Sequence, residues 1–332
     1  MQIFSQPNYD FLRWRWHAIA LSLVVIAAGI VLMATRGLPL GIDFSGGSSM
    51  VVRFSQDVTL DQVRNAVAAL PGEEVVQQFG DPAERRVLIR LPQEEGVEEG
   101  AALEQASLRA EQALRSAGLP AFEVDNRELV GPVIGADLQR RGVYATLTSL
   151  LAITIYIAVR FRPSFAVGAI AATLHDVLVT LAFLMLFRYD ISLNVVAAIL
   201  TITGYSVNDT IVIFDRVREN LRSRRREPLA QVVNLSVNQT LGRTVITAGT
   251  TFLSVLALYL FGGEALEGFA FTMLVGVISG TYSTVFIASA IAIILSNQRG
   301  GRRPQAAVAP TAPSGEASER QAGRKPRRAR AS

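Results

Sequence analysis

The sequence predicts an α-helical membrane protein that crosses the bilayer six times and carries one α+β domain outside the membrane. Two observations support this fold class. Half of the 332 residues are hydrophobic, and they are gathered into six long runs rather than spread along the chain. A helix needs about 20 apolar residues to cross the hydrocarbon core, and these runs approach that length. Only the segment between the first two runs has the composition of a soluble domain.

The first apolar run covers about His17–Thr35 and follows Arg13 and Arg15. A cleaved signal peptide is the alternative interpretation. The apolar stretch of a signal peptide is usually about 7–15 residues long and ends at small residues, whereas this run is longer and ends at Ala34-Thr35-Arg36. We therefore predict an uncleaved membrane anchor.

Residues 36–138 show strand and helix patterns in the order β-α-β-β-α-β, which is typical of a ferredoxin-like domain. The first strand ends at Val51–Phe54. Thr59 is placed to cap the first helix, with Gln62 at the capping-box position, and Pro71-Gly72 ends that helix. The later elements are strands at 74–79 and 86–91 around a turn at 80–82, a helix at 97–117 and a strand at 121–130.

The other five spans follow closely, at about 143–159, 164–187, 191–214, 244–261 and 268–295. From Ser296 the composition shifts to Arg, Pro, Ala, Ser and Gly, which cannot bury apolar surface, so we predict a disordered tail. The predicted organisation is an N-terminus with the first span (1–35), the α+β domain (36–138), the helical bundle (139–296) and the basic tail (297–332).

The charges predict the orientation of the chain. Basic residues of short loops favour the cytoplasmic side. Six spans place four basic segments on one side: Arg13 with Arg15, Arg160 with Arg162, Arg216–Arg226, and the tail. Only Arg140 and Arg141 oppose this trend. We therefore expect cytoplasmic termini and an extracytoplasmic domain, which is acidic, with nine arginines and seventeen carboxylates in residues 36–138.

The composition also excludes several kinds of function. The chain has no cysteine and two histidines, which excludes disulfides, thiolate metal sites and histidine-rich metal sites. An acidic soluble domain argues against nucleic-acid binding. No HExxH, GxSxG or GxxxxGK[ST] motif is present, so we expect no catalysis, no cofactor and no metal. An ion gradient or a partner ATPase must then supply energy.

Asp209 in the fourth span is the first candidate functional residue. It precedes Asp215, at the predicted end of the span, by six residues, which places it about 9 Å into the membrane. An ionisable side chain inside a bilayer costs roughly 2.5–3.5 kcal/mol to insert, so it needs a partner and indicates a transport pathway. We interpret Asp209 as a proton-carrying group, whose helix face also holds Thr201, Gly204, Tyr205 and Asn208. A purely structural carboxylate is the alternative.

Arg243, at the start of the fifth span, is the candidate partner of Asp209. Thr240, Thr247, Thr250 and Ser254 continue its helix face at spacings of three and four residues, and Thr251 adds a further hydroxyl. If this polar stripe faces Asp209, the two charges form a switchable ion pair lined by hydroxyls. The alternative is that the Arg243 side chain extends to the cytoplasmic interface.

Two further groups of polar or small residues lie within the spans. His175 and Asp176 are central in the third span, where Asp176 fits either a proton relay or a structural hydrogen bond, and His175 favours the structural interpretation. Gly276 and Gly280, with Ser279 and Ser283 nearby, have the small-xxx-small spacing that indicates close helix packing.

Four segments resemble one known family. Gly41–Gly47 (GIDFSGG), Leu174–Val177, Gly204–Asn220 and Arg243–Thr251 are similar, in this order, to motifs of SecF, a component of the Sec protein-export system. The resemblance covers about residues 10–296. In the first motif, Gly41, Gly46 and Gly47 allow tight turns with positive φ, and we interpret Asp43 as a structural cap or ion-pair partner.

The resemblance implies a bacterial inner-membrane protein whose six helices form half of an RND-like transporter. SecD would supply the other half and a further carboxylate. The pair would use the proton-motive force to promote late steps of export, with Asp209 and Arg243 conducting protons. Expected partners are SecD, the SecYEG channel, a YidC-like insertase, unfolded polypeptides and membrane lipids. A proton-coupled exporter of small molecules or lipids is the alternative, although such exporters usually have larger outer domains.

Overall fold

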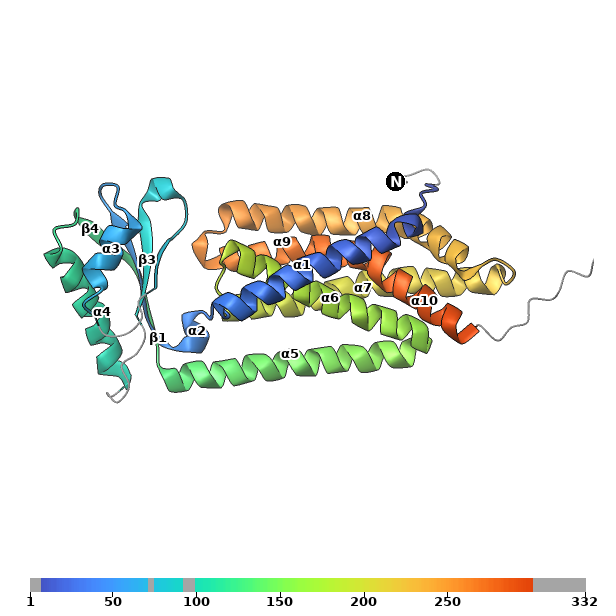
Figure 1. Cartoon of the computed structure of the whole chain (residues 1–332), viewed down its shortest axis with the longest axis horizontal. Coiled ribbons are helices and arrows are strands. Elements are labelled where there is room, and N and C mark those ends of the chain that lie inside the picture. The colour runs from blue at the N-terminus through green and yellow to red at the C-terminus, as the bar shows by residue number, and fades with distance from the viewer. Residues whose placement is uncertain (1–6, 71–74, 92–98, 301–332) are drawn as a thin grey trace, which may run out of the picture.

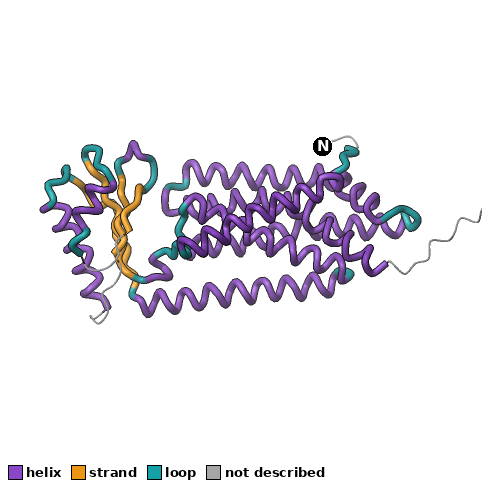
Figure 2. The backbone as a smooth tube through the Cα atoms, viewed as in Figure 1, coloured by secondary structure: helices purple, strands orange, loops and turns teal. Residues whose placement is uncertain are grey.

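The computed structural model describes residues 7–70, 75–91 and 99–300. The molecule is elongated, with the α+β domain at one end and a bundle of long helices at the other (Figure 1). The described chain begins and ends at the end of the bundle that is far from the domain. Within the described residues, all strands lie in the domain (Figure 2).

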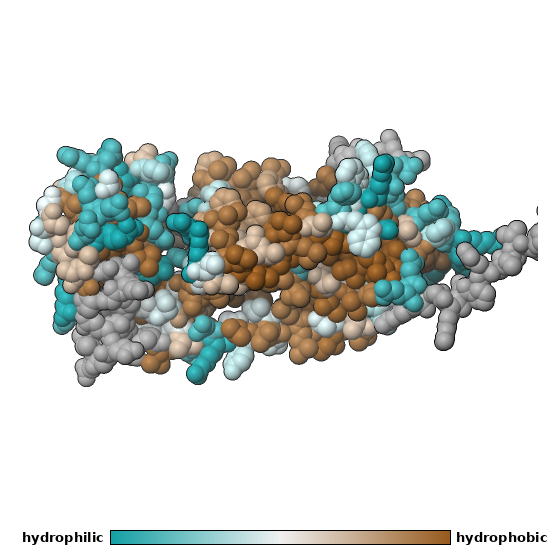
Figure 3. Space-filling model, in the orientation of Figure 1, coloured by the Kyte–Doolittle hydropathy of each residue, from teal (hydrophilic) through white to brown (hydrophobic). Residues whose placement is uncertain are grey.

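The predicted six spans are present: among the described residues, six helices are long and apolar enough to cross a membrane. The first is α1 (Arg15–Arg36), preceded by the 3-10 turn η1 (Phe11–Trp14). The next four are α5 (Pro132–Arg160), α6 (Pro163–Phe187), α7 (Leu193–Ser223) and α8 (Leu229–Phe261). The sixth consists of α9 (Glu264–Ser283), the π-helical turn η3 (Thr284–Ala288) and α10 (Ser289–Gly300). On the face shown in Figure 3, apolar side chains cover the middle of the bundle, whereas the domain is mainly polar.

Four spans are clearly longer than predicted. The sixth runs from Glu264 to Gly300, past Ser296, where we predicted the disordered tail to begin, and residues 301–332 of that tail lie outside the described residues. Helix α5 begins at Pro132, within the segment that we predicted as soluble domain. Helix α7 continues to Ser223, and α8 begins at Leu229 rather than near Thr244. The added turns of α7 and α8 are amphipathic, and their apolar residues, such as Val217, Val233 and Val237, are buried in the core of the bundle. Packing therefore extends these helices beyond the segments that hydropathy identifies.

The domain has the predicted β-α-β-β-α-β order. Its elements are β1 (Gly47–Phe54), α3 (Leu60–Val67), β2 (Val75–Gln78), β3 (Arg86–Leu91), α4 (Glu99–Ser116) and β4 (Phe122–Val130), with the 3-10 turn η2 (Pro82–Glu84) between β2 and β3. The sheet is antiparallel with strand order β2-β3-β1-β4. The capping box of Thr59 and Gln62 is confirmed, with both reciprocal hydrogen bonds formed.

The domain core lies between the sheet and the helices α3 and α4, which cover the sheet face that points away from the bundle (Figure 1). Met50, Val52 and Ile89 of the central strands are buried there against Val63 of α3 and Leu114 of α4. This apolar cluster is separate from those of the membrane helices, so the domain has its own source of stability.

The GIDFSGG segment forms the connection between the bundle and the domain. It contains the short helix α2 (Ile42–Ser45), after which Gly46 and Gly47 have φ of 69° and 114°. The expectation of positive φ is wrong for Gly41, whose φ is −65°. Gly41 is needed instead for a close approach, because a Cβ there would lie 3.1 Å from the carbonyl oxygen of Ile191.

Candidate functional site

Asp209 lies on α7 with its carboxylate turned toward α8. Its Oδ1 accepts a hydrogen bond from the Thr244 hydroxyl at 2.8 Å. Its Oδ2 is buried and has no hydrogen-bond partner among the described residues. The carboxyl group is thus anchored through one oxygen, while the other is free to receive a proton.

Arg243 is close enough for an electrostatic interaction with Asp209, but among the described residues the two side chains are not joined by a hydrogen bond or an ion pair. The guanidinium of Arg243 is exposed, and Thr244, the next residue, is the one that contacts Asp209. Consecutive helical residues differ by about 100° in direction, which explains why only one of the two faces α7. Sequence reasoning named the arginine and missed the adjacent threonine as the direct donor.

The other residues of the predicted stripe lie on the outer surface of α7 and α8. Thr201 and Asn208 of α7 are exposed, as are Thr247 and Thr250 of α8. The later residues of the α8 stripe are thus open to the surroundings of the chain rather than buried against α7. Tyr205 and Thr251, which interact across the two helices, are partly buried, as is Thr240 at the start of the stripe. We call this surface the open polar face; it consists of Thr201, Gly204, Asn208, Arg243, Thr247, Thr250 and Ser254.

Asp176 of α6 is the centre of a buried hydrogen-bond cluster. Its side chain is 1% exposed and accepts hydrogen bonds from three serines: Ser206 of α7 (2.5 Å) and Ser279 and Ser283 of α9 (2.7 and 2.8 Å). His175 Nδ1 lies 3.0 Å from the same carboxylate. Asp176 therefore joins three helices, and both of its oxygens are fully engaged.

His175 extends this cluster to the first helix. Its Nε2 lies 2.8 Å from the Ser22 hydroxyl of α1, and Tyr282 donates a hydrogen bond to the carbonyl oxygen of Ala18 in the same helix at 2.6 Å. Sequence reasoning missed Ser22 and Ser206. Ser22 is a lone polar residue in an apolar run, and Ser206 stands among the other polar residues of the segment 204–210, so the sequence alone gives no sign that both belong to the cluster around Asp176.

The π-helical turn η3 lies beside the residue that follows Asp209. The Thr284 hydroxyl is 2.9 Å from the hydroxyl of Thr210, and Ser289 donates a hydrogen bond to the carbonyl oxygen of Thr284. Such turns are irregular insertions in a helix and are frequent at functional sites. Helix α7 thus carries Asp209 on one side and contacts η3 and the Asp176 cluster on the other.

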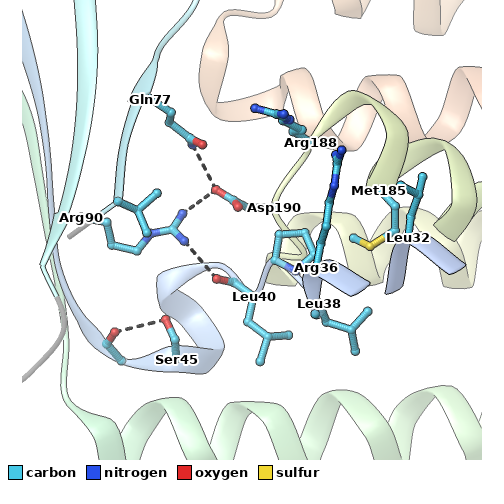
Figure 4. Close-up of a pocket in the computed structure, with 14 residues that line it drawn as sticks. Leu32, Arg36, Leu38, Leu40, Ser45, Gln77, Arg90, Met185, Arg188 and Asp190 are labelled. Atoms are coloured by element: carbon cyan, nitrogen blue, oxygen red, sulfur yellow. Dashed lines mark hydrogen bonds and ion pairs between the residues drawn. The ribbon is translucent and has the colours of Figure 1, made fainter. Parts of the chain in front are cut away.

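The α6–α7 loop connects this part of the bundle to the soluble domain. Arg90 of β3 forms an ion pair with Asp190 of the loop and donates a hydrogen bond to the carbonyl oxygen of Leu40 at 3.1 Å (Figure 4). At the start of α7, Asp43 accepts a hydrogen bond from the Leu193 amide at 2.8 Å. Asp43 therefore caps a membrane helix, and the first turn of α7 is bound to the segment that enters the domain.

Among residues 7–70, 75–91 and 99–300, no group of three His, Cys, Asp or Glu side chains could hold a metal ion. The chemistry of the described site is therefore that of carboxylates, hydroxyls and one guanidinium, which can accept, donate and relay protons.

Comparison with known proteins identifies two family matches. The family described as Protein export membrane protein SecD/SecF, C-terminal, matches residues 109–298, and the SecD/SecF GG Motif matches residues 31–58, which include Gly46 and Gly47. The chain is 42% identical over 287 residues to the protein translocase subunit SecF of Desulfurispirillum indicum, covering 85% of this chain and 90% of that protein. It is 40% identical over 292 residues to SecF of Escherichia coli O157:H7, covering 88% and 89%.

Two solved structures of SecDF also match. The crystal structure of SecDF, a translocon-associated membrane protein from Thermus thermophilus, superposes with a TM-score of 0.77 at 35% identity over 88% of this chain. SecDF in a super-membrane-facing form gives a TM-score of 0.65 at 35% identity over 90% of this chain. The chain spans 39% and 40% of the length of those two SecDF chains.

Proposed function

Because the chain belongs to the SecF family, we propose that it is an auxiliary subunit of the Sec protein translocase in the bacterial inner membrane. With SecD, it would use the proton-motive force to promote late steps of protein export. The single observation that carries the proton-coupling part of this proposal is the Asp209 carboxyl, which has one anchored oxygen and one buried oxygen without a partner.

In the proposed mechanism, a proton binds to the free oxygen of Asp209 and neutralises its charge. The attraction between Asp209 and Arg243 is then lost, which changes the packing of α7 against α8. Moving one charge across 100 mV provides about 2.3 kcal/mol, which shifts a two-state equilibrium roughly 50-fold. The start of α7 is bound to Asp43 and lies next to Asp190, so a movement of α7 would reach the soluble domain.

The two solved SecDF structures support a mechanism in which this part of the protein changes conformation. They match this chain with equal identity and nearly equal coverage, yet with TM-scores of 0.77 and 0.65. The matched region therefore differs in shape between them. We infer that such a difference, driven by protonation, would alter the position of the soluble domain relative to an emerging polypeptide.

SecD is the proposed occupant of the open polar face. A polar surface within membrane spans is costly in contact with lipid, and the relay would need a further carboxylate on the other side of Arg243. The SecYEG channel and a YidC-like insertase are proposed as further partners. Copurification of SecD-like and SecYEG-like chains would support this assembly, whereas their absence would favour a free-standing proton-coupled exporter.

The proposed orientation places both termini in the cytoplasm and the α+β domain outside it. The arrangement in Figure 1 agrees with this proposal, because the described chain begins and ends at the same end of the bundle. Since the chain lacks cysteine, single introduced cysteines and a membrane-impermeant thiol reagent would test the orientation.

The relay is tested by Asp209→Asn and Arg243→Met in the assembled complex. Asparagine keeps the acceptor for Thr244 but cannot exchange a proton, and methionine removes the positive charge near Asp209. Both variants should insert into the membrane normally and lose the stimulation of preprotein export by a proton gradient. Export and proton flux would be measured together in inverted membrane vesicles.

Asp137→Asn is the matched control, because Asp137 is an exposed carboxylate on a membrane helix whose partner, Arg141, lies one turn away. This variant should retain gradient-dependent export. Normal gradient-dependent export and proton flux in Asp209→Asn vesicles would refute the relay.

A further inference from the structure

A cavity of about 670 Å³ lies where the bundle meets the soluble domain. Its walls come from the ends of α1 and α6, the linker after α1, the α6–α7 loop and the strands β2 and β3 (Figure 4). This volume lies within the range of pockets that hold small molecules. Because α1 and α6 both end here, the cavity opens at the surface of the membrane on the side of the soluble domain.

The rim of this cavity is positively charged. Three arginines, Arg36, Arg90 and Arg188, line it, against one carboxylate, Asp190. Asp190 is engaged by Arg90 and also accepts a hydrogen bond from Gln77 at 3.4 Å. Arg36 and Arg188 lie on the opposite side of Asp190 from Arg90 (Figure 4). Within the described parts of the chain, both are exposed and neither guanidinium forms a hydrogen bond or an ion pair.

The backbone of Arg188 gives an independent reason to assign a role to its side chain. Arg188 ends α6 in the left-handed conformation, with φ of 60°, where glycine is preferred because it has no Cβ. A non-glycine residue in this conformation carries a local strain. The dipole of α6 favours a cation at this end, but it does not require a guanidinium with five donors.

The side of the cavity formed by the ends of α1 and α6 is apolar. Leu32 of α1, Leu38 of the linker after α1 and Met185 of α6 line it, and Leu38 is 48% exposed. The outer surface of α1 below these residues is also apolar, with Ile30 and Val31 exposed as expected for a lipid-facing helix. The cationic side chains therefore lie next to an apolar surface that can contact acyl chains.

We propose that this cavity binds the headgroup of an anionic phospholipid from the leaflet on the side of the soluble domain. The phosphodiester would lie between Arg36 and Arg188, whose planar guanidinium groups match pairs of phosphate oxygens, and the acyl chains would descend along Leu32 and Leu38. The bound headgroup would be in contact with both the bundle and the domain, next to the Arg90–Asp190 ion pair.

The test uses the full chain in nanodiscs of phosphatidylcholine that contain a minority of phosphatidylglycerol, with native mass spectrometry of the retained lipid. The unmodified chain should retain phosphatidylglycerol in preference to phosphatidylcholine. Arg36→Gln and Arg188→Gly should each lower this preference roughly fivefold, as expected for the loss of one arginine near an anionic lipid surface, and the double variant should lower it further.

Arg188→Gly also separates binding from folding. Glycine relieves the left-handed backbone, so this variant should unfold at the same temperature as the unmodified chain, or higher, when no anionic lipid is present. A loss of lipid retention in this variant cannot then be attributed to a damaged fold.

Arg140→Gln is the matched control, because Arg140 is an exposed arginine near the domain end of α5 that does not line the cavity. Its lipid preference should equal that of the unmodified chain. Equal losses in Arg140→Gln and in the cavity variants would overturn the proposal, as would full retention in the double variant. Displacement of the lipid by an equal concentration of soluble glycerol phosphate would identify a soluble-phosphate site instead and would also overturn it.

Discussion

Asp176 and Asp209 lie on adjacent helices, and their carboxylates are held in opposite ways. Asp176 is fully buried and accepts hydrogen bonds through both oxygens from three serines, with His175 beside it. Asp209 has a single donor and one oxygen without a partner among the described residues. The first arrangement fixes a charge in place, whereas the second leaves room for a proton. We therefore propose Asp209 as the relay residue and Asp176 as a structural centre.

This assignment predicts different costs for the same substitution at the two positions. Asp176→Asn replaces an acceptor oxygen with an amide donor and leaves serine hydroxyls without acceptors, which should lower the free energy of unfolding by roughly 1–3 kcal/mol for each unsatisfied group. Asp209→Asn keeps the bond to Thr244 and should cost less than about 1 kcal/mol. Thermal unfolding of the two variants in detergent measures the difference. Native stability of Asp176→Asn with a loss of gradient-dependent export would instead make Asp176 a relay residue.

Glu111 in the soluble domain predicts a pH dependence. The Arg115 hydrogen bond (2.7 Å), with the further ion pair to Arg127, lowers the pKa of Glu111 below its ordinary value of 4.5. Because the pKa is lower in the folded state, this contribution to stability is fully present above about pH 4.5 and is lost as the pH falls through the folded-state pKa.

Glu111→Gln should therefore destabilise the packing of α4 on β4 at neutral pH, and the difference from the unmodified chain should vanish in strong acid. Hydrogen exchange of α4 and β4 amides in the full chain, at a series of pH values, checks this. Glu104→Gln, an exposed change on the same helix, should show no such pH dependence. A Glu111→Gln effect of constant size from neutral to acid pH would contradict the expectation.

The residues that the sequence could not predict are those whose role depends on packing. Hydropathy and helical spacing identified Asp209, Arg243 and Asp176, because a charge in an apolar run is conspicuous. The donors to these carboxylates, Thr244 and Ser206, are small hydroxyl residues of kinds that also occur elsewhere in the spans. Their function follows from which helices are neighbours, and a single sequence does not contain that information.

At the scale of the elements, α7 and α9 approach closely at a glycine. A Cβ on Gly276 would lie 2.1 Å from Cδ1 of Ile202 and 2.5 Å from two further atoms of that side chain. Isoleucine is β-branched and stiff in a helix, so it cannot move aside easily. The small-residue spacing in the sixth span therefore serves close packing.

Gly276→Ala should consequently lower stability by roughly 1–3 kcal/mol through overpacking. Adding Ile202→Ala removes the clashing atoms, so the double variant should lose less stability than the two single variants together. Gly249→Ala on α8 is the control, because nothing lies within 4 Å of a Cβ there, and it should be neutral or stabilising. Thermal unfolding in detergent distinguishes these outcomes, and strict additivity would show that the two residues do not compete for space.

Helix ends were predicted less well than helix positions. The extra turns of α8 include Asn234 and Asn238, which both donate to the carbonyl oxygen of Tyr9, and Asn238 also accepts from the Tyr9 amide. These turns are too polar to be recognised as part of a membrane span from hydropathy. They are helical nonetheless, and their asparagines hold the N-terminal segment against the bundle. In the domain, by contrast, local signals were sufficient: the Thr59 capping box and the strand patterns gave the correct order of elements.

At the scale of the whole molecule, one ion pair connects the sheet to the membrane bundle. The side chains of Arg90 and Asp190 are 14% and 23% exposed, so their interaction is shielded more than an ordinary surface pair. Arg90 also binds the carbonyl oxygen of Leu40, and Leu40 and Ile191 form a β-bridge beside it. The loop before α7 and the linker after α1 are thereby held against β3.

Arg90→Gln should loosen the domain from the bundle without unfolding it. Spin labels on introduced cysteines at Asp61 and Leu266 would report the distance between domain and bundle, and the distance distribution should broaden in this variant. Arg53→Gln, which removes the ion pairs of Arg53 with Glu123 and Asp125 on the same sheet, should leave the distribution unchanged. Equal widths in all three proteins would show that other contacts orient the domain.

The open polar face also affects how long an unassembled copy of the chain persists in a cell. An unassembled copy would present the hydroxyl, amide and guanidinium groups of Thr247, Asn208 and Arg243 to acyl chains or to any passing helix. Desolvation of such groups is costly, so a single copy is poorly suited to remain alone in a bilayer. The same surface would therefore mark surplus copies for membrane proteases, and the amount of this subunit would follow the supply of the protein that covers it.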